Sequence, residues 1–275
     1  MPRYSANLSF LYPELPFAER FAAAARDGFA AVEYVSPYEQ PPETIAGLLR
    51  DHGLAQALFN IPAGDWDGGE RGIACLPDRV AEFEASVETT IRYAAVLGCS
   101  RVHCMAGLAP VDADPAELEA TFVANLRHAA PRFAAVGVQL LIEPINTRDM
   151  PGYFLPTVAM AERILDIVAE DNLFIQYDIY HAQVMQGDLL PTFARLKDRI
   201  AHIQIADHPG RNEPGTGEIN YRFVLRELDR LGYDGWVGCE YRPSSGVGAE
   251  LGWISEMGDR RAAPTSPILH RHPRA

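Results

Sequence analysis

The sequence predicts an α/β protein built as a single closed (β/α)8 barrel. Short β-rich apolar runs alternate eight times with segments of helical period, the pattern of parallel strands joined by crossover helices. The chain has 275 residues, 48% of them hydrophobic, which is sufficient for one large core. The segment after the first expected strand, Ser9 to Pro13, has no glycine-rich phosphate loop, which disfavours an open doubly wound sheet.

The expected strands are short runs rich in branched and aromatic residues. They cover residues 5–8, 31–35, 56–60, 101–104, 139–143, 174–178, 201–205 and 236–240. Helical spacing of apolar residues occurs between them, at 16–27, 41–52, 78–97, 114–135, 157–170, 188–198 and 220–231. A glycine stands where several of these helices must stop before the next strand, at Gly28, Gly53, Gly98, Gly137 and Gly232.

We expect residues 1–258 to form one catalytic domain, because no stretch within residues 1–240 has the composition of a linker. From Ser244 onward the composition shifts to Ser, Gly, Pro, Arg and His, with a short apolar piece at residues 251–254. That piece predicts a short last helix, and residues 259–275 are expected to form a loosely ordered tail.

The charge balance narrows the classes of partner. Lys and Arg number 24 and Asp and Glu 37, a net charge of -13, which disfavours nucleic acid and anionic membranes. The apolar runs fall short of the ~20 residues of a membrane span, and the first residues lack a signal-peptide pattern. We therefore expect a cytoplasmic protein, with a homo-oligomer left open. Its four cysteines form no C-x-x-C pair and are expected to be free thiols used in packing.

Function in such a barrel belongs at the carboxyl ends of the strands, where the last four strands each place an oxygen-bearing side chain. These side chains are Glu143, Asp178, Gln204 and Glu240. Three carboxylates at one rim would repel each other unless a cation neutralised them. An all-oxygen set suits Mg²⁺ or Mn²⁺ better than zinc. Each acid could alternatively cap a helix or pair with an arginine, but four oxygen-bearing side chains at matching strand ends favour a metal site.

Two further residues are candidates for substrate binding. His181 follows Asp178 by three residues, where the chain leaves strand six, and Arg211 lies on a Gly/Pro-rich loop after strand seven. A guanidinium there could bind the carboxylate of a small substrate; a structural histidine and a solvated surface charge are the alternatives. Four residues at the other strand ends are equally compatible with hydrogen bonding inside the barrel mouth: Asn7, Glu33, Asn60 and His103.

Several long segments closely resemble the hydroxypyruvate isomerase family, which belongs to the xylose-isomerase-like TIM barrels. They are Leu-Ile-Glu-Pro-Ile-Asn-Thr-Arg-Asp at 141–149, Gln-Tyr-Asp-Ile-Tyr-His at 176–181, His-Ile-Gln-Ile-Ala-Asp at 202–207, Arg-Asn-Glu-Pro-Gly-Thr-Gly-Glu-Ile-Asn-Tyr at 211–221, and Gly-Tyr-Asp-Gly-Trp-Val-Gly-Cys-Glu-Tyr at 232–241. The resemblance extends from the first strand to about residue 243, and long local matches are more specific than any single spacing.

The resemblance implies roles for individual residues. Glu143, Asp178 and Glu240 match metal ligands of the related ketose 3-epimerases, whose two Glu residues also exchange protons with the substrate. Gln204 stands where those epimerases have His, which favours the hydroxypyruvate isomerase branch. His181 and Arg211 match the substrate-contacting His and Arg of the relatives.

The implied reaction interconverts hydroxypyruvate and 2-hydroxy-3-oxopropanoate through an enediolate. Either Glu143 or Glu240 would remove the carbon-bound proton, and Arg211 would bind the substrate carboxylate. A 2-oxo-tetronate isomerase or a ketose 3-epimerase would use the same proton chemistry on a longer molecule. A DNA endonuclease of the same barrel type would want more His ligands and a basic surface. The non-enzymatic alternative, a sugar-acid-binding protein, is disfavoured because both candidate proton-transfer residues are present.

Overall fold

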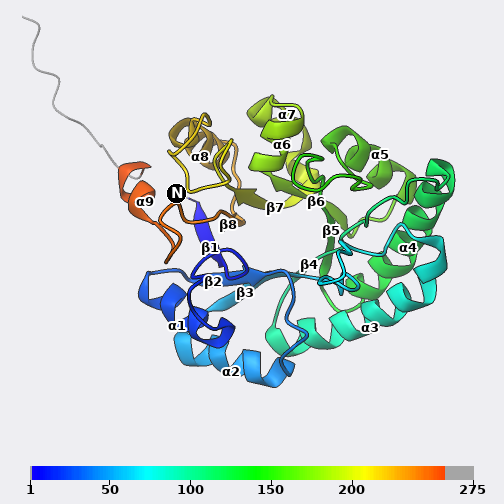
Figure 1. Cartoon of the computed structure of the whole chain (residues 1–275), viewed down its shortest axis with the longest axis horizontal. Helices are drawn as coiled ribbons and strands as arrows, with labels where there is room; N and C mark the ends of the chain where they lie inside the picture. The colour runs from blue at the N-terminus through cyan, green and yellow to red at the C-terminus, as the bar shows by residue number, and fades with distance from the viewer. Residues whose placement is uncertain (1, 258–275) are drawn as a thin grey trace, which may run out of the picture.

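Eight parallel strands close into a barrel in the computed structural model, which describes residues 2–257. Each strand pairs with the next along the chain, and the first pairs with the last, so the sheet has no free edge. The strands are β1 (Arg3–Asn7), β2 (Ala31–Tyr34), β3 (Ala55–Asn60), β4 (Arg101–His103), β5 (Gln139–Ile142), β6 (Leu173–Asp178), β7 (Ile200–Ile205) and β8 (Trp236–Cys239). Figure 1 shows them at the centre of a ring of helices. The predicted (β/α)8 barrel is confirmed.

Every helix expected from the sequence has a counterpart in the ring. The α-helices are α1 (Phe17–Arg26), α2 (Pro42–His52), α3 (Val80–Leu97), α4 (Pro115–Ala134), α5 (Val158–Val168), α6 (Ile179–Met185), α7 (Leu189–Leu196), α8 (Tyr221–Arg230) and α9 (Gly252–Met257), with short 3-10 turns at Pro77–Arg79 and Lys197–Arg199. The expected last helix is α9. The sequence did not predict α6, whose seven residues are too few for a helical period to show. The expected tail, residues 259–275, and residue 258 lie outside the described residues.

The glycines expected to end helices adopt the backbone geometry that this role requires. All five have positive φ, between 62° and 91°, a region that residues with a Cβ rarely enter. Gly53 and Gly98 are themselves the C-caps of α2 and α3. These positions are therefore the points at which the chain turns back toward the next strand.

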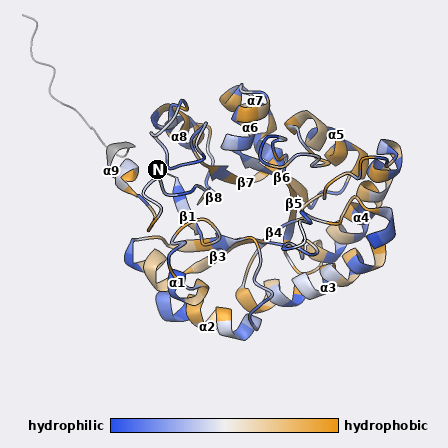
Figure 2. Cartoon of the chain, viewed as in Figure 1, coloured by the Kyte–Doolittle hydropathy of each residue, from blue (hydrophilic) through white to orange (hydrophobic). Residues whose placement is uncertain are grey.

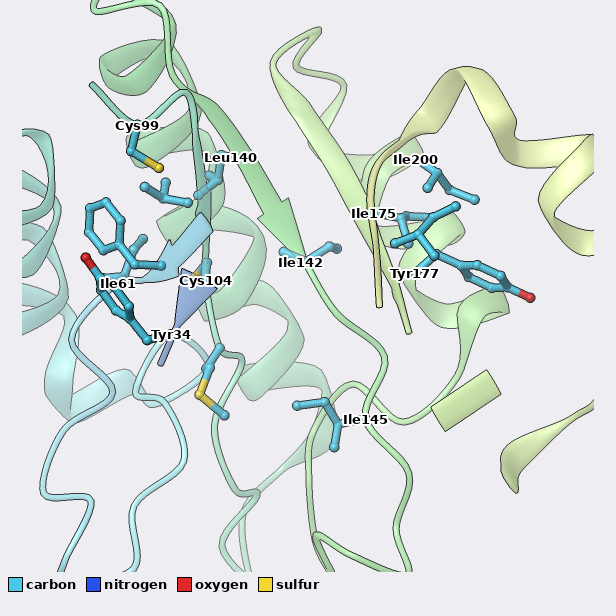
Figure 3. Packing of buried hydrophobic residues seen from close by; sticks show 14 of the residues in the cluster. Tyr34, Ile61, Cys99, Cys104, Leu140, Ile142, Ile145, Ile175, Tyr177 and Ile200 are labelled. Atoms are coloured by element: carbon cyan, nitrogen blue, oxygen red, sulfur yellow. The ribbon is translucent and has the colours of Figure 1, made fainter. Parts of the chain in front are cut away.

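The apolar core lies between the strands and the helices. Side chains on the outward face of the strands, such as Leu140, Ile142 and Ile175, are buried there (Figure 3). The helices carry both hydrophobic and hydrophilic residues, as expected of elements with one buried and one solvated side (Figure 2). All four cysteines are free and buried, as predicted.

The inside of the barrel is polar instead. Residues at alternate positions of the same strands point inward, among them Asn7 on β1, Glu33 on β2 and Gln204 on β7, all at most 2% exposed. They hydrogen-bond to each other across the barrel, so the interior supports a polar site rather than a second apolar core. Among the described helices, none combines the length and hydrophobicity that a membrane crossing requires.

Candidate active site

The structure brings the residues singled out from the sequence to one end of the barrel. Glu143 follows β5, Asp178 ends β6, Gln204 lies near the end of β7 and Glu240 follows β8. A cavity of about 240 Å³ opens there, within the size of a small ligand, and its lining includes Glu143, His181, Gln204, Arg211 and Glu240. The carboxylate of Asp178 is fully buried beside it.

Glu33 organises the polar interior beneath this cavity. It is fully buried and accepts hydrogen bonds from Ser5 Oγ (2.7 Å), Asn7 Nδ2 (3.2 Å), His202 Nε2 (2.9 Å) and Gln204 Nε2 (2.8 Å). Strands β2 and β7 are not neighbours in the sheet, so the contacts to His202 and Gln204 cross the barrel interior. Burial raises the pKa of Glu33, but attraction to His202 and these hydrogen bonds outweigh it and hold the pKa below its usual range.

Space for the Glu33 carboxylate comes from a glycine on β8, which is separated from β2 by β1 alone. A Cβ at Gly238 of β8 would lie 2.2 Å from Glu33 Oε1 and 2.5 Å from Oε2. The residue two positions before Glu240 is therefore glycine because a carboxylate occupies the room a side chain would need.

Glu240 receives hydrogen bonds on both carboxylate oxygens. Oε1 accepts from Arg211 Nη2 at 2.5 Å, and Oε2 accepts from Asn7 Nδ2 at 2.7 Å and Gln204 Nε2 at 2.6 Å. The Gln204 amide oxygen in turn accepts from Gln176 Nε2 at 2.7 Å. Because its amide donates to Glu33 and Glu240, Gln204 links the interior network to the cavity and fixes the orientation of Glu240.

Arg211 reaches the cavity from a strained backbone. Its φ is 55°, a left-handed value uncommon for a residue with a side chain. The buried guanidinium lies between the rings of Phe10 and Tyr180, 4.8 Å and 5.2 Å from their centroids. It also lies within 3.6 Å of Asp149 and 3.8 Å of Asp178. Arg211 is thus not a solvated surface charge.

The loop that carries Arg211 is folded around one carboxylate. Asp207 accepts hydrogen bonds from the backbone N–H groups of Gly215 (2.8 Å), Gly217 (2.9 Å) and Ile219 (3.0 Å). The Arg211 N–H donates to the Asp207 carbonyl at 2.8 Å. The Gly/Pro-rich segment after β7 is therefore an ordered support for Arg211.

His181 presents an N–H group to the cavity. Its Nδ1 lies 2.6 Å from Asn146 Nδ2 and 3.4 Å from the Asn146 backbone N–H, both of which donate, so Nδ1 accepts. The proton of the neutral ring is then on Nε2, which lies 3.5 Å from Asp178 Oδ2 and 3.4 Å from Arg211 Nη2. Burial, followed by Arg211, holds the pKa of His181 well below its usual value, so the ring is neutral. This geometry suits a donor to a substrate oxygen.

With all its carboxyl groups ionised, the cavity would hold more negative charge than Arg211 neutralises, and the pKa values of these groups are raised accordingly. Burial raises the pKa of Asp178 to about 6 and that of Glu240 to about 8, although Arg211 lowers both. Burial, followed by repulsion from Glu240 and Asp178, holds the pKa of Glu143 well above its usual range. A second cation would relieve this repulsion.

The donor atoms fit such a cation. Glu143 Oε1 and Asp178 Oδ2 are buried without a hydrogen-bond partner, and buried carboxylate oxygens are normally paired. Ligand atoms of Glu143, Asp178 and His181 lie within 4.8 Å of one another. These residues could hold a divalent metal, although the tautomer of His181 makes the two carboxylates the better ligands.

Some residues of the site were not identified as functional from the sequence. Gln176 and His202 each lie two positions before a predicted site residue, Asp178 and Gln204. Residues two apart on a strand share a face, and this spacing was the one sequence signal that could have placed them inside the barrel. His103, by contrast, was named from the sequence as a residue of the barrel mouth, and its Nδ1 lies 3.6 Å from Glu143 Oε2; burial lowers its pKa to about 3, so it is a neutral neighbour of that carboxylate. Nothing in the sequence pointed to Phe10 or Tyr180 as the rings around Arg211.

Comparison with known proteins gives one family and similar relatives. The model of the xylose isomerase-like TIM barrel family matches residues 21–257. The chain is 51% identical to the 2-oxo-tetronate isomerase of Cupriavidus necator, over 92% of this chain and 98% of the relative. It is 46% identical to the hydroxypyruvate isomerase of Escherichia coli, over the same shares of the two chains.

A solved structure extends the similarity to three dimensions. A Brucella melitensis protein described as an AP endonuclease of family 2 superimposes with a TM-score of 0.90 at 42% identity, covering 93% of this chain and 99% of that one. The fold and the site geometry thus belong to a chain that resembles isomerases along nearly its whole length.

Proposed function

This chain belongs to the xylose isomerase-like TIM barrel family, and from that premise we propose that it interconverts hydroxypyruvate and 2-hydroxy-3-oxopropanoate. It is an isomerase, like the named relatives that match more than nine-tenths of its length. The two compounds differ by a proton moved between adjacent carbons and a proton moved between their oxygens. The reaction therefore needs acid-base groups and no redox partner.

The observation that carries this proposal is the pairing of Glu143 and Glu240 in one small cavity. They arrive from β5 and β8, and both line the cavity together with Arg211 and His181. Two carboxylates near one substrate can remove a proton from one carbon and return a proton to its neighbour. A protein that only bound sugar acids would not need both.

The chain's own groups supply the proton transfer at the carbon atoms. One of the two Glu carboxylates accepts the carbon-bound proton, and electrons move toward the carbonyl oxygen to give an enediolate. The other carboxylate, in its protonated form, donates to the neighbouring carbon, while the hydroxyl proton on the first carbon moves to the former carbonyl oxygen, so that an aldehyde and a secondary alcohol replace the primary alcohol and the ketone. The His181 Nε2–H can donate a hydrogen bond to a substrate oxygen, and Arg211 lies where negative charge develops. The assignment of base and acid between the two Glu residues stays open.

The proposed cofactor is a divalent metal, Mg²⁺ or Mn²⁺. Glu143 and Asp178 supply the unpaired oxygens for it, and Gln204 and Glu240 remain the other predicted ligands. When bound, the cation would neutralise the carboxylates and stabilise negative charge on the substrate oxygens. The hard oxygen donors of this set suit either ion.

Replacing Asp178 by Asn is expected to weaken binding of Mn²⁺ or Mg²⁺ by more than about tenfold, because the cation loses one anionic ligand. The measurement is calorimetric titration of EDTA-treated protein with each ion. Asp166→Asn is the control, since Asp166 is an exposed residue of α5 that pairs with Arg199 and takes no part in the cavity. Equal affinity of Asp178→Asn and wild type, or no uptake of either ion by wild type, would remove the metal from the proposal.

A second candidate substrate is 2-oxo-tetronate, which is one carbon longer. One observation favours it, the 51% identity to an isomerase of that name. An outer cavity of about 970 Å³ shares Phe10, Val35, Trp66 and Arg242 with the inner one, so the inner cavity opens into it.

A substrate panel tests the proposal. The metal-loaded protein is incubated with hydroxypyruvate, 2-oxo-tetronate and an uncharged ketohexose, and products are followed by NMR. We expect conversion of a 2-oxo acid and little or none of the ketohexose. Conversion of the ketohexose alone would indicate a ketose epimerase, and binding of the acids without conversion would indicate a sugar-acid-binding protein.

The name of the Brucella structure suggests DNA as another substrate class. The net charge of -13 works against it, since binding a phosphate backbone requires a cationic surface. The innermost guanidinium of the cavity, that of Arg211, is also paired with carboxylates of this chain. We therefore propose a small hydroxy-oxo acid as the partner, and neither nucleic acid nor membrane.

A further inference from the structure

The proposed substrates are themselves anions, and the inner end of the cavity offers them little free positive charge. Arg211, the residue predicted to bind the substrate carboxylate, donates to Glu240 at 2.5 Å and lies near Asp178 and Asp149. A second carboxylate brought to this guanidinium would also meet Glu143 and Glu240. A cation that is free of such partners elsewhere along the cavity would bind the substrate carboxylate without this repulsion, and this step rests on the proposed function.

Two other guanidinium groups line the same cavity. Arg71 lies in the loop after β3 and Arg242 in the loop after β8. Within residues 2–257, neither forms a salt bridge with an Asp or Glu side chain, whereas Arg211 contacts three carboxylates. Arg242 is exposed and also lines the outer cavity, which places it where the inner cavity opens.

Arg71 is held in position by its own loop. Its Nη1 donates to the carbonyls of Trp66 (2.9 Å) and Glu70 (2.6 Å), and the guanidinium lies 4.0 Å from the centroid of the Trp66 ring. The acid next to it, Glu70, is already paired with Arg79 at 2.5 Å. Arg71 therefore keeps a net positive charge and unused N–H groups at a fixed place, as an anion site requires.

Arg242 is tied by its backbone to the loop that carries Arg211. Its N–H donates to the Arg211 carbonyl at 2.8 Å, and its carbonyl accepts from Asn212 Nδ2 at 2.7 Å. Both bonds are made by the backbone of Arg242, and its side chain takes part in neither. The backbones of the outer arginine and the buried one are thus held together, and the guanidinium of the outer one has no carboxylate partner among residues 2–257.

We propose that Arg242, together with Arg71, binds the carboxylate of the substrate at the mouth of the cavity and directs the two reacting carbons inward to Glu143 and Glu240. Arg211 acts instead beside the reacting atoms. In 2-oxo-tetronate the extra hydroxymethyl group lies on the far side of the reacting carbons from the carboxylate, so it points into the cavity. The pair selects acids over uncharged ketoses.

The test compares Arg242→Ala and Arg71→Ala with Arg211→Ala and with Arg50→Ala, an exposed arginine of α2, as the control. Loss of a charge-assisted contact is expected to raise KM for the converted acid by about tenfold to a hundredfold in each outer variant. Turnover at saturation should change much less, whereas Arg211→Ala should lower kcat. Arg242→Lys should be intermediate, because it keeps the charge and loses the planar fork.

A binding measurement keeps the proposal testable even if no substrate of the panel is converted. Wild-type protein should bind glycerate more tightly than its uncharged amide, glyceramide, and Arg242→Ala should lose that preference while its thermal unfolding stays unchanged. Equal preference in wild type and Arg242→Ala would overturn the proposal, and so would a preference lost only in Arg211→Ala. Absence of turnover with this preference intact would count against the proposed reaction alone.

Discussion

Glu240→Gln and Glu143→Gln are each expected to lower kcat by about 10²–10⁴-fold, the usual contribution of general acid-base catalysis. Glutamine keeps an oxygen and nearly the same shape, but it cannot accept or donate the proton that moves between carbons. Both side chains are buried in the cavity, so water has little access to replace them. KM should change far less than kcat, because the substrate carboxylate is bound elsewhere.

Steady-state kinetics with the substrate converted in the panel is the measurement. Glu88→Gln is the matched control, since Glu88 is an exposed partner of Arg132 on the outer helices. Thermal unfolding of each variant identifies a loss caused by misfolding. Near-normal kcat in both Glu143→Gln and Glu240→Gln would rule out the acid-base pair, whatever the metal does.

His202→Leu is expected to lower the free energy of unfolding by about 3–5 kcal/mol, because it leaves the Glu33 carboxylate buried without its partner. The two side chains are fully buried and 2.9 Å apart. In a Glu33→Gln background the same substitution should have a smaller effect, since no uncompensated charge remains. Urea denaturation of the four proteins gives the coupling.

The pH dependence of stability gives the same pair a second test. The folded pKa of Glu33 is below its usual value, so its contribution to stability is present above the unfolded pKa and is lost as the pH falls through the folded pKa. Glu33→Gln should therefore lose less stability than wild type below about pH 4.3. Equal acid sensitivity, or an equal effect of His202→Leu in both backgrounds, would mean that the pair does not carry the charge assigned to it.

The sequence predicted the barrel and the rim because both depend on repetition. Eight strand-helix units set the closed sheet, and oxygen-bearing side chains at matching strand ends placed Glu143, Asp178 and Glu240 together. The cross-barrel contact of Glu33 with His202 was beyond prediction, since 169 positions separate them and only the closed sheet makes them neighbours. The spacing of residues along one strand does not indicate which residues of a distant strand face them across the barrel.

The surroundings of Arg211 illustrate the same limit. Its place on the loop after β7 suggested a substrate contact, but its left-handed backbone and its ion pair with Glu240 depend on how that loop folds around Asp207. No sequence signal marked Arg71 and Arg242, because the loops after β3 and β8 bring them to the cavity only in the folded chain. Helix α6 similarly begins directly at the Asp178 cap, with no separate sequence signal.

In the proposed reaction, Glu143 and Glu240 move a proton between adjacent carbons of a 2-oxo acid. The most direct test is to run the reaction with wild-type protein in D₂O and to follow label at the reacting carbons by NMR. We expect product that carries solvent deuterium at the carbon that receives the proton, because a carboxylate exchanges its proton with solvent. Product formed at full rate without deuterium would contradict this mechanism and indicate direct hydride transfer between the carbons.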